Sequence, residues 1–212
     1  TPPAWFLKTY PSAAQENRAG RPQVHGGRRH ICSNHPAYVE KSVEIARRMA
    51  REFGRDEAVV GWQIDNEIYA FDGCFCENCR REFLKYLQEK FGAIDNLNAA
   101  WNNNIFSQWY ADFSDIPLPR DAWHNPHLNL AYKNFQNDAH IRFVHAQADA
   151  MREFAPQPIG TDTMPFFGMD YRKLSEKLDV MQFNHYNDPE TLYHSALWMD
   201  YLRTLKDRPF WN

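Results

Sequence analysis

The sequence alternates short apolar runs with longer amphipathic segments, and this alternation limits the folds that the chain can adopt. The runs are predicted to be buried strands, because they are short and bounded by turn-forming residues. They occupy residues 58–64, 157–164, 178–186 and 208–212. Strands that alternate with helices pair in parallel, so the sequence predicts an α/β fold.

Amphipathic helices are predicted between the strands. One should begin at Pro36, since proline is favoured at the first helical position, and end before Gly54. Its apolar face would comprise Val39, Val43, Ile45, Ala46, Met49, Ala50 and Phe53. A long helix should carry a core face of Phe135, Ile141, Val144, Ala148 and Met151. This long helix is expected over 128–154, and the other helices over 77–91, 94–101, 170–178 and 190–206. Residues 1–35 are expected to form an irregular loop.

Four predicted strands suit either a doubly wound sheet or part of a (β/α)8 TIM barrel. The chain begins in a loop without a preceding strand and stops at Asn212, inside a predicted strand. A sheet cut on both sides would expose two edges. We therefore expect a partial (β/α)8 barrel and a fragment of a longer protein.

Composition narrows the classes of function. The net charge is -3, which supplies no basic field for nucleic acid. No apolar run approaches the roughly 20 residues of a membrane-spanning helix. Aromatic residues make up 15% of the chain, an excess that suits a core and also a sugar-binding cleft.

Three polar residues, Asp65, Asn66 and Glu67, directly follow the apolar run "VVGWQI". A strand cannot bury a carboxylate cheaply, so these residues should lie at its carboxyl end, where α/β folds build active sites. Glu67 is therefore a candidate general acid/base. A lone glutamate at a strand end is also commonly a capping or solvated residue, but the adjacent amide of Asn66 favours the catalytic interpretation.

The four cysteines are unevenly spaced. Cys74, Cys76 and Cys79 lie within "CFCENC", whereas Cys32 is distant in the sequence. A Cys-x-Cys pair makes a strained disulfide, while a tight loop can supply several thiolates to tetrahedral zinc. The spacing favours a structural zinc site, with disulfide bonds as the alternative.

Several long motifs together resemble glycoside hydrolase family 42, the β-galactosidases. They are "PPAWFLKTYP", "GGRRHICSNHPAY", "VVGWQIDNE", "CFCENCRREFLKYL", "LNAAWNNNIFSQWY" and "RPFWN", in the family's order and over nearly the whole chain. The resemblance implies a (β/α)8 catalytic barrel followed by two smaller domains, often assembled as a homo-trimer. It implies hydrolysis of terminal β-D-galactosides with retention of configuration. Residues 1–212 would be the central part of that barrel, about strands 4 to 7.

The resemblance also implies roles for individual residues. Glu67 matches the family's acid/base at the end of strand 4, and Asn66 matches a neighbouring asparagine that contacts galactose. Arg28 matches a sugar-binding arginine, with a solvated loop residue as the alternative. Tyr186 falls near the end of strand 6, where relatives carry an aromatic that faces the nucleophile, although a core or rim tyrosine is nearly as good an interpretation. Phe106 occupies the position expected for a substrate-stacking tryptophan.

Two departures from the family pattern bear on activity. At Phe106 the indole is lost, so either Trp109 compensates or the subsite differs. The nucleophile, a glutamate a few residues past "PFW", would lie beyond Asn212, so the 212-residue chain alone is expected to be inactive. Within the chain three carboxylates are available, but none of them fits the nucleophile's position: Asp162, Asp179 and Asp188.

For the cysteines, the resemblance implies a closed structural zinc site of Cys32, Cys74, Cys76 and Cys79, and no catalytic cofactor. A zinc-thiolate site prefers reducing conditions, which favours a cytoplasmic location. Two rival functions are a retaining glycosidase for another sugar, such as an arabinopyranoside or fucoside, and a non-catalytic sugar-binding or zinc-scaffold protein.

Overall fold

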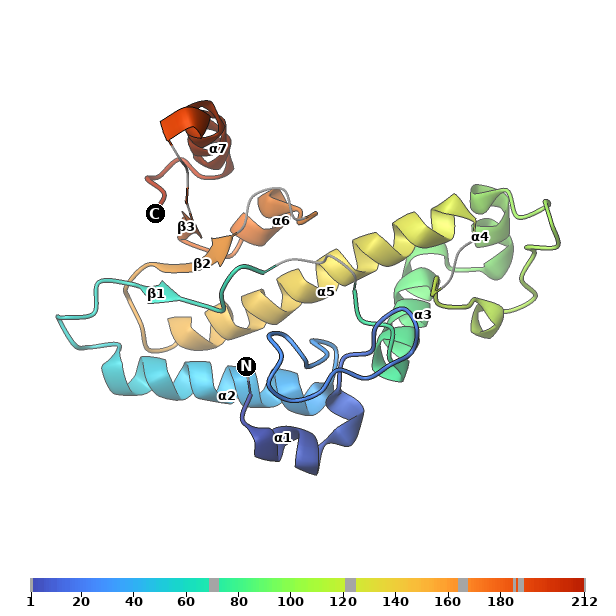
Figure 1. The fold of residues 1–212 in the computed structure, drawn as a ribbon, viewed down its shortest axis with the longest axis horizontal. Coiled ribbons are helices and arrows are strands. Elements are labelled where there is room, and N and C mark those ends of the chain that lie inside the picture. The colour runs from blue at the N-terminus through green and yellow to red at the C-terminus, as the bar shows by residue number, and fades with distance from the viewer. Residues whose placement is uncertain are drawn as a thin grey trace. The chain divides into compact units, whose positions relative to one another are not determined.

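The computed structural model describes residues 2–68, 73–120, 125–163, 168–184, 186 and 189–211. The fold is α/β with a parallel sheet, whose strands are labelled in Figure 1. The chain divides into two compact units. The cysteine unit comprises Thr1–Tyr38 and Asp72–Ala139, and the sheet unit comprises Val39–Phe71 and His140–Asn212. Among the helices of the described residues, none combines the length and apolar character that crossing a bilayer requires.

The sheet unit contains three strands in the order β1-β2-β3, and they pair in parallel as predicted. They are β1 (Trp62–Gln63), β2 (Ile159–Thr163) and β3 (Val180–Phe183). Each is shorter than its apolar run. β1 is shortest because the run enters it from the surface: Val60 is 80% exposed. The expected fourth strand, 208–212, appears as a single parallel bridge between Trp211 and Gln182. The last residue of this predicted strand, and residue 164 of the second predicted strand, lie outside the described residues.

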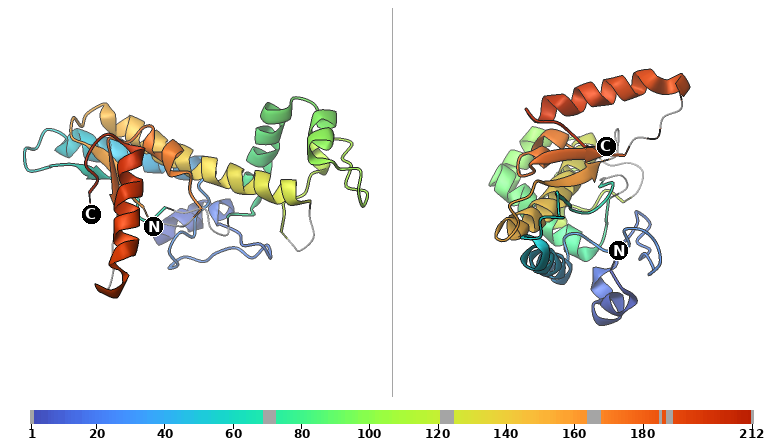
Figure 2. Two further views of the ribbon diagram at one scale, coloured as in Figure 1. Left: turned by 90° about the horizontal axis from the view of Figure 1, so that it is seen from above. Right: turned by 90° about the vertical axis from the view of Figure 1, so that its left-hand side faces the viewer.

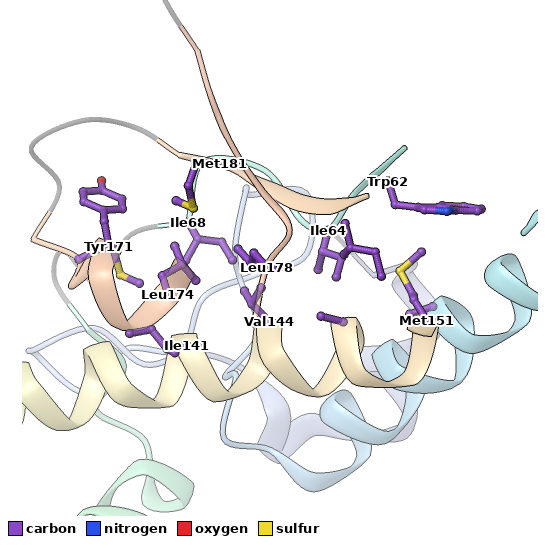
Figure 3. Close-up of a cluster of buried hydrophobic side chains, with 14 of the residues drawn as sticks. Trp62, Ile64, Ile68, Ile141, Val144, Met151, Tyr171, Leu174, Leu178 and Met181 are labelled. Atoms are coloured by element: carbon purple, nitrogen blue, oxygen red, sulfur yellow. The ribbon is translucent and has the colours of Figure 1, made fainter. Parts of the chain in front are cut away.

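Helices pack against one face of this sheet. The sheet unit includes most of α2 (Pro36–Phe53), the second half of α5 (Pro126–Arg152), α6 (Tyr171–Ser175) and α7 (Leu192–Leu205). The views in Figure 2 show α7 beside β3 and α6. In Figure 3 the α5 side chains Ile141, Val144 and Met151 point toward Ile64 and Leu174. Burying each such side chain contributes about 1.5–3 kcal/mol, which ties the helices to the sheet.

The predicted core face of α5 is confirmed, while that of α2 is only partly buried. Ala46 and Ala50 are buried, but Ile45, Met49 and Phe53 are 60%, 47% and 47% exposed. The two alanines are one turn apart, so a narrow stripe of small residues makes the contact. The bounds of α2 and its end before Gly54 are as predicted.

The cysteine unit holds α1 (Ala4–Thr9), η1 (Pro11–Ala13), α3 (Glu77–Phe91), α4 (Ile94–Trp101), η2 (Phe113–Asp115) and the first half of α5. The expectation of an irregular loop over 1–35 is wrong for α1 and η1. Phe6 explains this, because its buried ring packs on Tyr10 and Tyr38 and so anchors a short helix. Gly92 ends α3 as predicted, with a φ of +70° that glycine adopts without strain. The main core of the unit is formed by Phe75, Phe83, Leu87, Leu97, Ile116, Leu128 and Phe135 among others.

Candidate functional site

The segment after β1 has an unusual backbone. Asp65 and Glu67 adopt φ values of +57° and +50°, which cost a non-glycine residue on the order of 1–3 kcal/mol. The chain returns to the sheet at once, because Ile68 is fully buried and forms a parallel bridge with Thr163. Backbone strain that the surrounding structure maintains is typical of functional sites.

Glu67 is half-buried and points toward the carboxyl end of β3. Asn184, one residue past that strand, donates from Nδ2 to Glu67 Oε1 over 2.7 Å. The backbone N–H of Asn184 in turn donates to the Thr163 carbonyl. The Glu67 carboxyl, just past β1, is therefore bonded by a residue just past β3, whose backbone is bonded in turn to the end of β2. Glu67 lies at the carboxyl ends of the strands, as the strand-end argument predicts.

The face of the sheet opposite the apolar core carries polar residues. Trp62 and Met181 belong to the apolar core. Because side chains alternate along a strand, their neighbours Gln63 and Gln182 point to the opposite face of the sheet. Asp162 is in register with Gln182 and shares this polar face.

Asn66 is held at the edge of this polar face. Gln63 Nε2 donates to Asn66 Oδ1 over 3.1 Å and to the Asp65 carbonyl over 3.0 Å. The Asp65 carboxylate accepts from the Asn66 N–H over 2.7 Å. These bonds orient the amide beside Glu67.

The other sequence-predicted residues are exposed. Tyr186 is 82% exposed, two residues past Asn184 in the sheet unit. Phe106 is 72% exposed with a φ of +54°, and Arg28 is exposed; both belong to the cysteine unit. Asp179 is one of the carboxylates that do not fit the nucleophile's position, and it pairs with Arg152. It lies at the amino end of β3, whereas Glu67 lies at the carboxyl end of the sheet. Asp188 lies outside the described residues.

The four cysteines converge in the cysteine unit. All are buried free thiols, and their Sγ atoms lie within 4.8 Å of one another. Asn34 donates from its backbone N–H to Cys32 Sγ and from Nδ2 to Cys79 Sγ, each over 3.4 Å. With Zn–S bonds of about 2.3 Å, four tetrahedral ligands would be about 3.8 Å apart, so this donor set fits a zinc ion.

The electrostatics of the cluster favour a cation. Hydrogen bonds with the other three thiols lower the pKa of Cys76. Hydrogen bonds with Cys74, Cys76 and Cys79, together with burial, raise the pKa of Cys32. Negative charge on one sulfur thus opposes charge on the others. A divalent cation removes that repulsion, because it stabilises all four thiolates at once.

Gln136 on α5 holds the backbone of Cys74. Its Oε1 accepts from the Cys74 N–H over 3.2 Å, and its Nε2 donates to the Cys74 carbonyl over 3.1 Å. Tyr132 donates to the same carbonyl. Gly73 approaches this contact with a φ of +67°, and a Cβ there would lie 3.2 Å from Gln136. Sequence reasoning missed Gln136, because nothing in the spacing along α5 distinguishes it from other polar helix residues.

We expect Gln136→Ala to weaken the cysteine loop by about 1–3 kcal/mol, because it leaves the buried Cys74 N–H without its acceptor. Amide exchange of residues 73–79 should then quicken by about 5- to 150-fold, measured by mass spectrometry on the full-length protein. Gln147→Ala is the matched control, since Gln147 bonds the Phe143 carbonyl, one turn earlier on the same helix. Equal exchange in the two variants would contradict the role given to Gln136.

Comparisons with known proteins agree with this architecture. The family model of glycoside hydrolase family 42, described as β-galactosidase, matches residues 1–212. β-Galactosidase YesZ of Bacillus licheniformis is 34% identical over 100% of this chain and 32% of its own length. Hence the chain spans about a third of the length of that curated relative.

Solved structures give the same result. The polyextremophilic β-galactosidase of the haloarchaeon Halorubrum lacusprofundi superposes with a TM-score of 0.93 at 32% identity, over 100% of this chain and 35% of that one. The β-galactosidase of Bacillus circulans sp. alkalophilus has a TM-score of 0.90 at 29% identity, over 98% and 32%. The chain belongs to glycoside hydrolase family 42, the β-galactosidase family.

Proposed function

We propose that the protein containing this chain is a retaining β-galactosidase, with Glu67 as its acid/base. The observation that carries the proposal is the half-buried Glu67 carboxyl held by Asn184 at the carboxyl ends of β1, β2 and β3. In (β/α)8 enzymes this end of the barrel is where catalytic groups are found. Residues 1–212 would be the central part of the catalytic barrel, with β1, β2, β3 and Trp211 as its strands 4 to 7.

In the proposed reaction Glu67 first donates its proton to the glycosidic oxygen while a glutamate nucleophile attacks the anomeric carbon. Glu67 then takes a proton from water, which releases galactose with retained configuration. The two carboxyl groups of such a pair lie about 5–5.5 Å apart. The nucleophile would come from sequence beyond Asn212, and this chain alone would not hydrolyse galactosides.

The remaining site residues have supporting roles in this proposal. Asn66, oriented by Gln63, would bond a galactose hydroxyl. Arg28, Tyr186 and Phe106 would line the substrate site, as their motifs imply. A homo-trimer of the full-length protein would follow from the resemblance alone. A cytoplasmic location would follow from a zinc-thiolate site, which prefers reducing conditions.

The cysteine cluster would hold a structural zinc ion through Cys32, Cys74, Cys76 and Cys79. Four protein ligands complete a tetrahedron and leave no position for water or substrate. The ion would therefore supply no chemistry to the reaction. It would fix the loop that carries Cys32 against the first turn of α3.

Substrate class can be tested with chromogenic glycosides and the full-length protein. We expect kcat/KM for a β-D-galactoside to exceed that for an α-L-arabinopyranoside, which lacks the hydroxymethyl group, by about 10- to 200-fold. Phe106 in place of an indole favours an altered subsite, so a β-D-fucoside belongs in the panel. A preference for either of the other sugars would overturn the galactosidase assignment, and turnover of none would favour a binding module.

A further inference from the structure

We propose that Asn184 is a positioning residue that anchors Oε1 of Glu67 and so keeps Oε2 as the oxygen that exchanges the proton. This inference rests on the proposed acid/base role of Glu67. It concerns the side chain of Asn184, which follows β3 whereas Glu67 follows β1, and which none of the sequence motifs singled out.

The geometry assigns the two carboxyl oxygens different tasks. The Asn184 Nδ2 group, 2.7 Å from Oε1, can only donate, so Oε1 accepts in either protonation state of Glu67. An oxygen that accepts this bond is a poor site for the proton. The proton of the acid form is therefore carried by Oε2.

Asn184 can act as an anchor because the sheet holds it. It directly follows β3, and its N–H donates to the Thr163 carbonyl at the end of β2. Glu67 stands on a segment with positive φ values, secured on the other side by the Ile68–Thr163 bridge. The carboxyl is thus fixed from two neighbouring strands, which limits rotation of a side chain that must meet the glycosidic oxygen within hydrogen-bonding distance.

The neutrality of the donor matters for an acid/base. A lysine or arginine at this position would favour the ionised form, whereas an amide serves both the acid and its conjugate base. Among the described residues, the titratable groups on the surrounding elements are Asp65 on the segment of Glu67, Asp162 on β2 and Tyr186 beyond β3. Within β3 and at Asn184 the side chains carry no charge.

The test uses Asn184→Asp and Asn184→Ala in the full-length protein, with Asn134→Asp, an exposed asparagine of α5, as the matched control. In Asn184→Asp a second carboxylate opposes ionisation of Glu67, so the alkaline limb of the kcat/KM profile should move up by about one pH unit or more. In Asn184→Ala, kcat/KM for a poor-leaving-group galactoside, which reports the first, acid-catalysed step, should fall by about 100-fold. With a dinitrophenyl galactoside, which needs little protonation, the fall should be smaller.

Two results would overturn the inference: an unmoved alkaline limb in Asn184→Asp, or equal losses for both leaving groups in Asn184→Ala. Either variant alone suffices if the other fails to fold. Glu67→Gln, assayed in parallel, separates this inference from the proposed function. If Glu67→Gln is inactive while both Asn184 variants behave as wild type, only the positioning role is wrong. If Glu67→Gln is active on the poor leaving group, the acid/base assignment and the inference both fail.

Discussion

Glu67→Gln in the full-length protein is expected to lower kcat/KM for a β-galactoside with a poor leaving group by about 10²- to 10⁴-fold. Glutamine keeps the shape of the side chain, and its Oε1 can still accept the hydrogen bond from Asn184. It cannot release a proton to the departing oxygen. The loss should therefore appear in the chemical step and leave the fold intact, which steady-state kinetics and circular dichroism would together establish.

Two controls make this result specific to general acid catalysis. A dinitrophenyl galactoside needs little protonation, so its first step should be much less affected than that of an alkyl galactoside. Glu153→Gln removes a carboxylate that pairs with Arg47 on the surface, and its kcat/KM should stay within about twofold of wild type. Equal losses for both leaving groups in Glu67→Gln would refute the acid/base assignment.

The sequence predicted the parallel sheet and the position of Glu67 for the same physical reason. A carboxylate is costly to bury in an apolar run, so Glu67 was expected where its strand leaves the sheet, although β2 does bury Asp162. Helix bounds set by local chemistry were also predictable, as at Pro36 and Gly92. These features depend on a few neighbouring residues.

Features that depend on packing were less accessible. The apolar stripe of α2 contains Ile45 and Met49, yet only Ala46 and Ala50 are buried, because the contact partner determines which part of an apolar face is covered. Asn184 was missed because it lies inside the third predicted run, 178–186, whereas β3 itself ends at Phe183. The strand-end argument depends on where a strand stops, and the sequence placed that end too late.

The cysteine site also combines features that local sequence predicts with features that depend on the fold. The spacing of Cys74, Cys76 and Cys79 made a metal site more favourable than disulfides, but it did not identify the fourth ligand. Cys32 came only from the resemblance to the family, since no local pattern joins it to the others. The structure brings its Sγ to 3.4 Å from that of Cys79. Asn34, which bonds two of the sulfurs, had no sequence signal beyond its closeness to Cys32.

Cys79→Ser is expected to reduce zinc bound by the full-length protein from about one ion per chain to a small fraction. A serine hydroxyl is a poor ligand for zinc, and Cys79 is fully buried, so solvent cannot replace it. Losing a structural metal is among the few changes that cost on the order of 4–5 kcal/mol. Amide exchange at the start of α3 should then quicken about a thousandfold. Elemental analysis and exchange mass spectrometry measure the two effects on one sample.

The decisive comparison is with Leu87→Ala on the same helix. Leu87 is as fully buried as Cys79, and its truncation should cost about 2–5 kcal/mol through the cavity that it leaves. This variant should lose stability and keep its zinc, because no ligand is touched. Cys79→Ser should lose both, and chelation of wild-type protein should reproduce its exchange pattern. If Cys79→Ser binds as much zinc as Leu87→Ala, the four thiols are not a metal site, and the cluster stabilises the loop only by burying sulfur.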